Sequence, residues 1–134
     1  MSLSFHISFN GQCKEAFEFY AQHLNGTIGT MLQYKDSPVT ASVSEEWQGK
    51  IVHANISIEG VEIAGGDVRP EQYQKPSGFN ILLGVKNEDT VKSLFEQFSV
   101  DGEVILSPQK TFFSPCYAIV VDGFGVPWKF SCGS

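Results

Sequence analysis

The feature that most constrains this chain is an order of predicted elements that occurs twice. In the first half, residues 5–9 alternate apolar and polar side chains, which is the period of a half-buried strand. Apolar residues at helical spacing then predict a helix over about 12–24, which Asn25-Gly26 ends. Three further strands are predicted over 27–34, 51–58 and 61–64.

The second half repeats this order. An apolar run over 79–85 predicts a strand, and a helix with Asn87 as its N-cap follows and closes at Asp101-Gly102. Strands are then predicted over 103–106, 116–121 and 126–132. Because neither half alone covers both faces of its sheet, we predict one α+β domain over 1–134, built from tandem β-α-β-β-β modules at about 1–68 and 78–134.

Two stretches carry no clear period. Residues 35–50 hold one proline, scattered polar residues and a lone Trp47, and we interpret them as a long loop that could serve as a lid. Residues 65–78 hold two prolines and predict a connector. Gly65-Gly66 is interpreted as a turn in which Asp67 satisfies backbone donors.

Composition narrows the possible partners and the compartment. The 134 residues are 42% hydrophobic, enough for one packed core, and the net charge of -6 disfavours a polyanionic nucleic acid. No apolar run approaches the ~20 residues of a membrane span, and residues 1–4 lack the features of a signal peptide. The three cysteines show no CxxC spacing, so we interpret them as reduced thiols and expect a cytoplasmic protein without nucleic-acid or membrane partners.

Overlaying the two halves selects candidate site residues. With Phe19-Tyr20 placed over Leu94-Phe95, Ile81 falls opposite His6. A similar comparison of the two hairpins matches His53-Ala54 with Tyr117-Ala118. The neighbouring apolar residues of both hairpin strands turn toward the helices, so His53 and Tyr117 are expected on the other face of each sheet.

Polar side chains could line a pocket there. His6 shares a strand face with Ser8, and His53 shares one with Asn55, whereas the simpler reading makes each histidine a solvated residue. Glu62 is either an exposed carboxylate or a base for a bound substrate. Tyr117 and Trp128 offer flat rings for stacking, with core packing the simpler role for Trp128. The predicted ligand-binding set is therefore His6, His53, Glu62, Tyr117 and Trp128.

Three segments carry a family resemblance. The opening HISFNGQCKEAFEFYAQHLNG, the central IVHANISIEG and the closing DGFGVPWKFSC resemble the PhnB-like (3-demethylubiquinone 3-methyltransferase-like) branch of the vicinal oxygen chelate superfamily. Phe113 and Ser114 depart from the Trp and Gly that are usual there. The resemblance implies the glyoxalase/bleomycin resistance fold, in which the modules curl into a cup-like mixed sheet with the helices outside, in a homodimer. It connects the chain to glyoxalases, extradiol dioxygenases, fosfomycin-modifying enzymes and bleomycin-binding proteins.

The resemblance also implies a divalent metal held by His or Glu from the first and last strands of each module. His6 stands near the first ligand position, and Glu62 or Ala64 stands near the second. The remaining positions hold Ile81 and Lys129, which cannot ligate as an alkyl chain and a protonated ammonium. We therefore expect no cofactor and no complete metal shell.

Two functions remain open. One is a small-molecule-binding protein that needs no metal, and the other is a metal-dependent lyase, isomerase or dioxygenase-like enzyme acting on a vicinal-oxygen substrate. The methyltransferase label of the branch is set aside, because the sequence carries no glycine-rich S-adenosylmethionine loop and no Rossmann order. Whether the chain is an enzyme stays undecided at this level.

Overall fold

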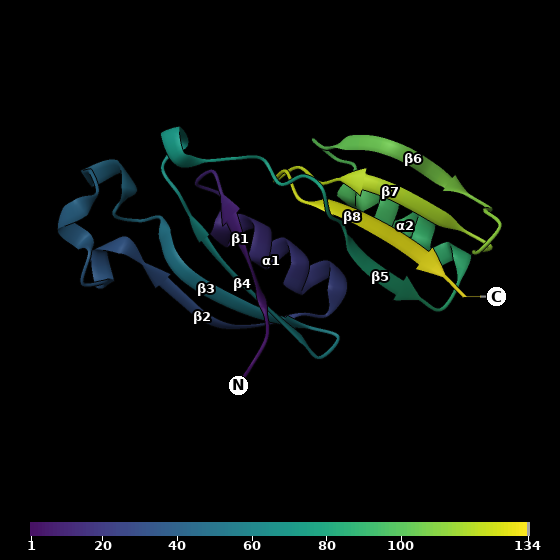
Figure 1. The fold of residues 1–134 in the computed structure, drawn as a ribbon, viewed down its shortest axis with the longest axis horizontal. Coiled ribbons are helices and arrows are strands. Elements are labelled where there is room, and N and C mark those ends of the chain that lie inside the picture. The colour runs from purple at the N-terminus through teal and green to yellow at the C-terminus, as the bar shows by residue number, and fades with distance from the viewer. Residues whose placement is uncertain (134) are drawn as a thin grey trace. The chain divides into compact units, whose positions relative to one another are not determined.

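The computed structural model describes residues 1–133 and divides the chain into two compact units, residues 1–74 and the residues from Lys75 onward. Each unit contains one helix and four strands in the predicted order (Figure 1). The first unit comprises β1 (Phe5–Phe9), α1 (Cys13–Leu24), β2 (Thr27–Gln33), β3 (Ile51–Ile58) and β4 (Val61–Asp67). The second comprises β5 (Ile81–Val85), α2 (Glu88–Phe98), β6 (Glu103–Gln109), β7 (Tyr117–Val121) and β8 (Pro127–Cys132).

The two sheets have the same topology. Their strand orders are β1-β4-β3-β2 and β5-β8-β7-β6. In each sheet the first strand of the unit pairs in parallel with the last, and the other pairs are antiparallel. The predicted α+β class and the repeated β-α-β-β-β order are confirmed.

One face of each sheet packs on the helix of its own unit. Phe17 of α1 lies against Gly65 of β4, and the Phe98 ring of α2 contacts the rings of Trp128 and Phe130 at 5.2 and 5.1 Å. The fully buried Ala54 and Ala118 occupy matching positions on these helix-covered faces. Burial of these apolar faces is the main source of stability in each unit.

The helix boundaries follow local signals. Asn87 accepts a hydrogen bond from Thr90 N at 2.9 Å, which confirms it as the N-cap of α2. Asn25, at a φ of 53°, ends α1 in the left-handed conformation and donates its backbone N–H to Ala21 O. The predicted helix ends were therefore right to within a residue or two.

The glycine pair before Asp67 was wrongly predicted as a turn. Gly65, Gly66 and Asp67 are the last residues of β4. A Cβ on Gly65 would lie 2.7 Å from Phe17 Cζ, and one on Gly66 would lie 2.8 Å from Val52 O. The glycines thus permit close packing of the helix and of the neighbouring strand, and this need is invisible in the local sequence.

Asp67 joins three segments of the first unit. Its side chain is 2% exposed, with Oδ1 accepting from Cys13 N and Oδ2 from Ile51 N, both at 2.9 Å. Burial raises the pKa of this carboxyl, whereas the two backbone hydrogen bonds and the charge of Lys50 lower it. Asp67 therefore satisfies backbone donors as predicted, but at the start of α1 and β3 rather than in a turn.

The register of β5 corrects the sequence overlay. Ile7 pairs with Gly65, which pairs with Ala54; in the second sheet Leu83 pairs with Phe130, which pairs with Ala118. The residue equivalent to His6 is therefore Leu82 and not Ile81. The overlay slipped because three residues separate β1 from α1 but only two separate β5 from α2, so one alignment cannot match both strand and helix.

Residues 34–50 are a folded loop rather than an irregular one. Three 3-10 helices span Tyr34–Asp36, Thr40–Ser42 and Glu45–Trp47, and Gln48 Nε2 donates to Thr40 O and Val43 O at 2.8 and 3.2 Å. A fourth 3-10 helix spans Pro70–Gln72. None of the helices within residues 1–133 is long and apolar enough to cross a membrane.

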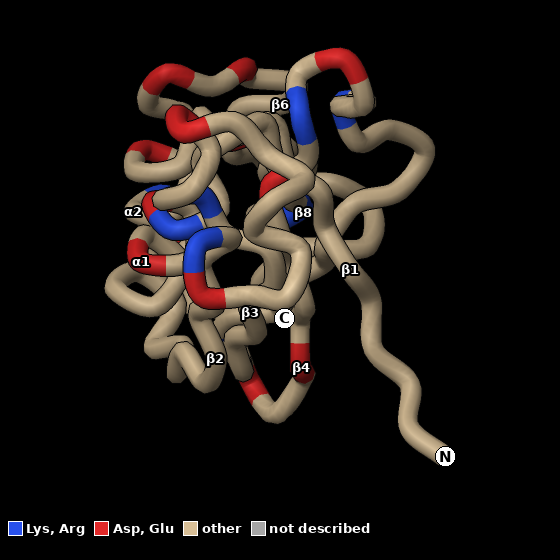
Figure 2. The backbone as a smooth tube through the Cα atoms, turned by 90° about the vertical axis from the view of Figure 1, so that its left-hand side faces the viewer, with Lys and Arg blue, Asp and Glu red and all other residues tan. Residues whose placement is uncertain are grey.

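Charged residues avoid the strands. Most acidic and basic positions lie in helices, turns and loops (Figure 2). Of the nine Lys and Arg residues, only Lys129 lies within one of the eight strands. A charge in that place needs a physical reason, since its neighbours along β8 are apolar or small.

Candidate functional site

We call the sheet face opposite the helix of its own unit the open face. In the first sheet the buried residues of β3 alternate with His53 and Asn55, so these two side chains belong to the open face. His6 pairs with Ala64, which pairs with Asn55, and these three residues form one row across β1, β4 and β3. Ser8 lies two residues beyond His6 on the same face. His6, Ser8, His53 and Asn55 thus share one face of the first sheet, with β4 between their two strands, and their role in binding stays a prediction.

The electrostatic environment of His6 includes His53. Partial burial lowers the pKa of His6, and the charge of His53 lowers it further. No carboxylate contributes to this shift. At neutral pH the His6 imidazole is therefore held in its neutral form, in which one ring nitrogen donates a hydrogen bond and the other accepts one.

Asn55 and Glu62 complete the polar side of this face. Asn55 Oδ1 accepts from Thr30 N at 2.9 Å, which ties the side chain to the edge strand β2. Glu62 pairs with Ser57 and is exposed, two residues along β4 from Ala64. Glu62 shares the open face with His6 but lies toward the β3–β4 hairpin, about 7 Å along the strand from the His6 row.

The open face of the second sheet is mainly apolar and aromatic. Tyr117 pairs with Ser131, while Lys129 lies between Leu82 of β5 and Ile119 of β7. The Lys129 ammonium is 6.0 Å from the centroid of the Tyr117 ring. Phe113 packs its ring edge to face against Tyr117 at 4.7 Å, so this departure from the usual Trp is still an aromatic contact.

Trp128 lies on the other side of this sheet. It is 1% exposed on the helix-covered face, and its indole N–H donates to Asp122 Oδ2 at 2.9 Å. Because the side chains of a strand alternate, Trp128 cannot share a face with Lys129. Its place in the core, the simpler of the two roles weighed from the sequence, is the one observed.

The family's metal shell does not fit these residues. At the positions implied by the resemblance, the paired strands hold His6 and Ala64 in the first sheet and Leu82 and Lys129 in the second. Methyl, isobutyl and protonated ammonium groups offer no lone pair to a divalent cation. Within residues 1–133, no three His, Cys, Asp or Glu side chains gather closely enough to hold a metal ion.

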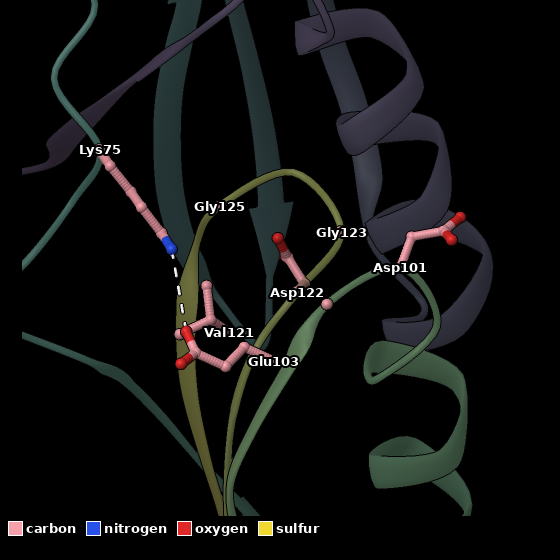
Figure 3. Close-up of a pocket in the computed structure, with 8 residues that line it drawn as sticks. Lys75, Asp101, Glu103, Val121, Asp122, Gly123 and Gly125 are labelled. Carbon is pink, nitrogen blue, oxygen red and sulfur yellow. Dashed lines mark ion pairs between the residues drawn. The ribbon is translucent and has the colours of Figure 1, made fainter.

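A cavity in the second unit lies at the opposite end of β7 from Tyr117. It has a volume of about 260 Å³, and its acidic lining residues are Asp101, Glu103 and Asp122 (Figure 3). Glu103 faces Lys75 at 3.9 Å, and Asp122 Oδ1 accepts from Phe124 N and Val126 N at 2.9 and 3.0 Å. Asp122 thus holds the β7–β8 turn and Glu103 pairs with Lys75, so two of the three carboxylates have a structural role.

Two exposed apolar side chains at the open face of the second sheet, Leu82 and Phe113, were not among the predicted site residues. The slipped overlay placed Leu82 opposite Ile7, a core residue of β1, yet the Leu82 side chain is 65% exposed. Phe113 lies in a segment without periodicity and was noted only as a departure from the family. Only the pairing of β5 with β8, in which Leu82 lies opposite Lys129, reveals the position of Leu82.

Residues 2–131 match the family described as 3-demethylubiquinone-9 3-methyltransferase. The chain belongs to this family. Protein YjdN of Escherichia coli is 29% identical over 136 residues, covering 96% of this chain and 92% of that protein. The structure of protein PA1353 from Pseudomonas aeruginosa is 31% identical, covers 99% of this chain and 98% of its own, and superposes with a TM-score of 0.87.

More distant structures identify the fold. A glyoxalase-related enzyme from Fulvimarina pelagi superposes with a TM-score of 0.67 at 13% identity, covering 99% of this chain and 89% of that chain. The fosfomycin resistance protein FosX from Listeria monocytogenes, in complex with Mn(II), superposes with a TM-score of 0.68 at 10% identity, covering 100% and 92%. The predicted glyoxalase/bleomycin resistance fold is confirmed.

Proposed function

We propose that this chain is a small-molecule-binding protein of the vicinal oxygen chelate superfamily that acts without a complete catalytic metal shell. The observation that carries this proposal is the composition of the two open faces. One face gathers His6, Ser8, His53 and Asn55, and the other gathers Tyr117, Phe113 and Lys129. Polar groups set in otherwise apolar surroundings are typical of small-molecule sites.

The family description names a methyltransferase, and we do not extend that reaction to this chain. The turn between β1 and α1 carries one glycine, Gly11, in the segment Asn10-Gly11-Gln12, whereas nucleotide-type cofactors are held by a glycine-rich loop where a parallel strand meets a helix N-terminus. A fold shared at low identity does not transfer chemistry. The residues on the open faces therefore carry the proposal.

A thermal-shift screen of small aromatic and oxygen-rich metabolites tests it, with His53→Ala and Tyr117→Ala as site variants. A ligand that stabilises the wild type should lose about 1–3 kcal/mol of binding energy in the Tyr117→Ala variant, for the lost aromatic contact. Glu18→Gln, at an exposed position on α1, serves as the control that should bind unchanged. A ligand that binds both site variants as tightly as it binds the wild type would contradict the proposal.

The alternative function is a metal-dependent lyase, isomerase or dioxygenase-like enzyme. The fold shared with Mn(II)-bound FosX is the observation in its favour. The two functions separate in elemental analysis of protein purified without chelator or affinity tag. Near-equimolar zinc, nickel, manganese or iron that disappears in His6→Ala favours the enzyme, because His6 is the one metal-ligating side chain at the four expected positions.

We further propose that the protein is a cytoplasmic homodimer. Edge strands leave backbone groups unpaired, and β6 exposes Val104 and Ile105 at such an edge. Light scattering should give twice the chain mass of 14.8 kDa. A mass of one chain throughout the micromolar range would contradict the dimer.

A further inference from the structure

The position of Lys129 indicates which class of ligand the open face of the second sheet binds. Lys129 lies in a row of apolar side chains, with Leu82 on one neighbouring strand and Ile119 on the other, followed by Leu106 on β6. A lysine is strongly hydrated, so a place among three aliphatic side chains costs solvation unless a partner compensates for it.

Within the second unit, up to residue 133, no carboxylate forms an ion pair with Lys129. The two ion pairs found within residues 1–133 join Arg69 to Glu71 and Lys75 to Glu103. Glu103, the acidic residue of β6 on this face, pairs with Val121 across the ladder and is directed to Lys75. The contact found for the Lys129 ammonium is the Tyr117 ring, at 6.0 Å from its centroid.

Space for a ligand lies beside this ammonium. Gly84 pairs with Ser131, which pairs with Tyr117, and a Cβ added to Gly84 would meet no atom within 4 Å. At the far side Phe113 leans against Tyr117 with 57% of its surface exposed. The result is an apolar and aromatic surface with a single positive charge within it.

We infer that this open face binds an amphipathic anion, namely a carboxylate or similar oxyacid attached to a flat apolar body. Lys129 binds the acid group, while Leu82, Tyr117 and Phe113 contact the apolar part. One ammonium matches one negative charge, and desolvation by the flanking aliphatic side chains strengthens that ion pair. This inference rests on the proposed function, because it names the ligand class for one of the same faces.

Lys129 supplies positive charge at a site where the family resemblance implies a metal ion. It occupies the strand position at which the resemblance implies a carboxylate ligand of a metal, and the equivalent position in the first sheet is Ala64. A protein ammonium thus offers an anionic ligand positive charge without a metal ion. This accounts for a cation at a position where an acidic residue is expected.

Calorimetric titration of the full chain with 1-naphthoate and with its uncharged amide, 1-naphthamide, tests the inference. The wild type should bind the naphthoate about tenfold or more tightly than the amide. Lys129→Met should abolish that difference while leaving amide binding nearly unchanged, and Lys129→Arg should keep most of it. Lys86→Met removes a charge from the same unit just beyond β5 and should leave both affinities as in the wild type.

The outcomes separate this inference from the proposed function. Equal affinities for the two probes, both weakened by Tyr117→Ala, would overturn the anion site while the binding function stands. A loss in Lys86→Met as large as that in Lys129→Met would show an effect of net charge and also overturn it. Naphthoate that fails to bind saturably counts against the anion site, even where the metabolite screen succeeds.

Discussion

Replacing the buried carboxylate of Asp67 tests whether one side chain holds three segments of the first unit together. In Asp67→Ala, the N–H groups of Cys13 and Ile51 lose acceptors that lie at 2.9 Å in the wild type. Each unsatisfied buried donor costs about 1–3 kcal/mol, so the two together cost about 2–6 kcal/mol. Removing a carboxyl whose pKa is raised by burial returns part of this energy, and we expect a net loss of about 2–5 kcal/mol.

Urea unfolding at pH 7, followed by circular dichroism, measures this loss. Asp67→Asn keeps one acceptor oxygen and turns an amide donor toward the other N–H, so its stability should lie between those of the wild type and the alanine variant. Asp36→Ala, at an exposed position in the 34–50 loop, is the control and should change stability by less than about 0.5 kcal/mol.

Amide hydrogen exchange locates the effect. Cys13 N–H and Ile51 N–H should lose protection in Asp67→Ala before the amides in the middle of β4 do, because only the former bond directly to the carboxylate. A variant as stable as the wild type, or one whose exchange rises evenly throughout the unit, would refute the reasoning that Asp67 bridges α1 and β3.

Two further predictions concern the open face and the packing beneath it. The His6 pKa, followed by NMR, should lie below the ordinary value of 6.5 and rise toward it in His53→Gln; no change would show that the two rings do not interact. Since the folded state depresses this pKa, the stability that His6 contributes is complete above about pH 6.5 and is lost as the pH falls through the lower folded-state value. Gly65→Ala places a Cβ 2.7 Å from Phe17 Cζ and should cost about 1–3 kcal/mol in chemical unfolding, whereas Gly49→Ala, with no atom within 4 Å, should cost little; equal losses in both variants would contradict the packing.

Local patterns in the sequence predict much of the fold. The alternation in β1 and the apolar stripes of α1 and α2 depend on residues within a few positions of one another, and they predicted these elements and their order correctly. The same alternation predicted that His53 and Tyr117 lie on the sheet face opposite Ala54 and Ala118, although Tyr117 is only 8% exposed. These properties follow from backbone geometry, which is the same wherever a strand or helix lies.

The tertiary structure alone determines the strand register and the contacts between residues that are distant in sequence. Whether Ile81 or Leu82 stands where His6 does depends on how β5 pairs with β8, and no pattern within β5 contains that information. Glycine is required at positions 65 and 66 of β4 because Phe17 and Val52, which are distant in sequence, lie where a Cβ atom would be. Lys129 is set among aliphatic side chains from three strands, and only the assembled sheet can show this placement of a charge.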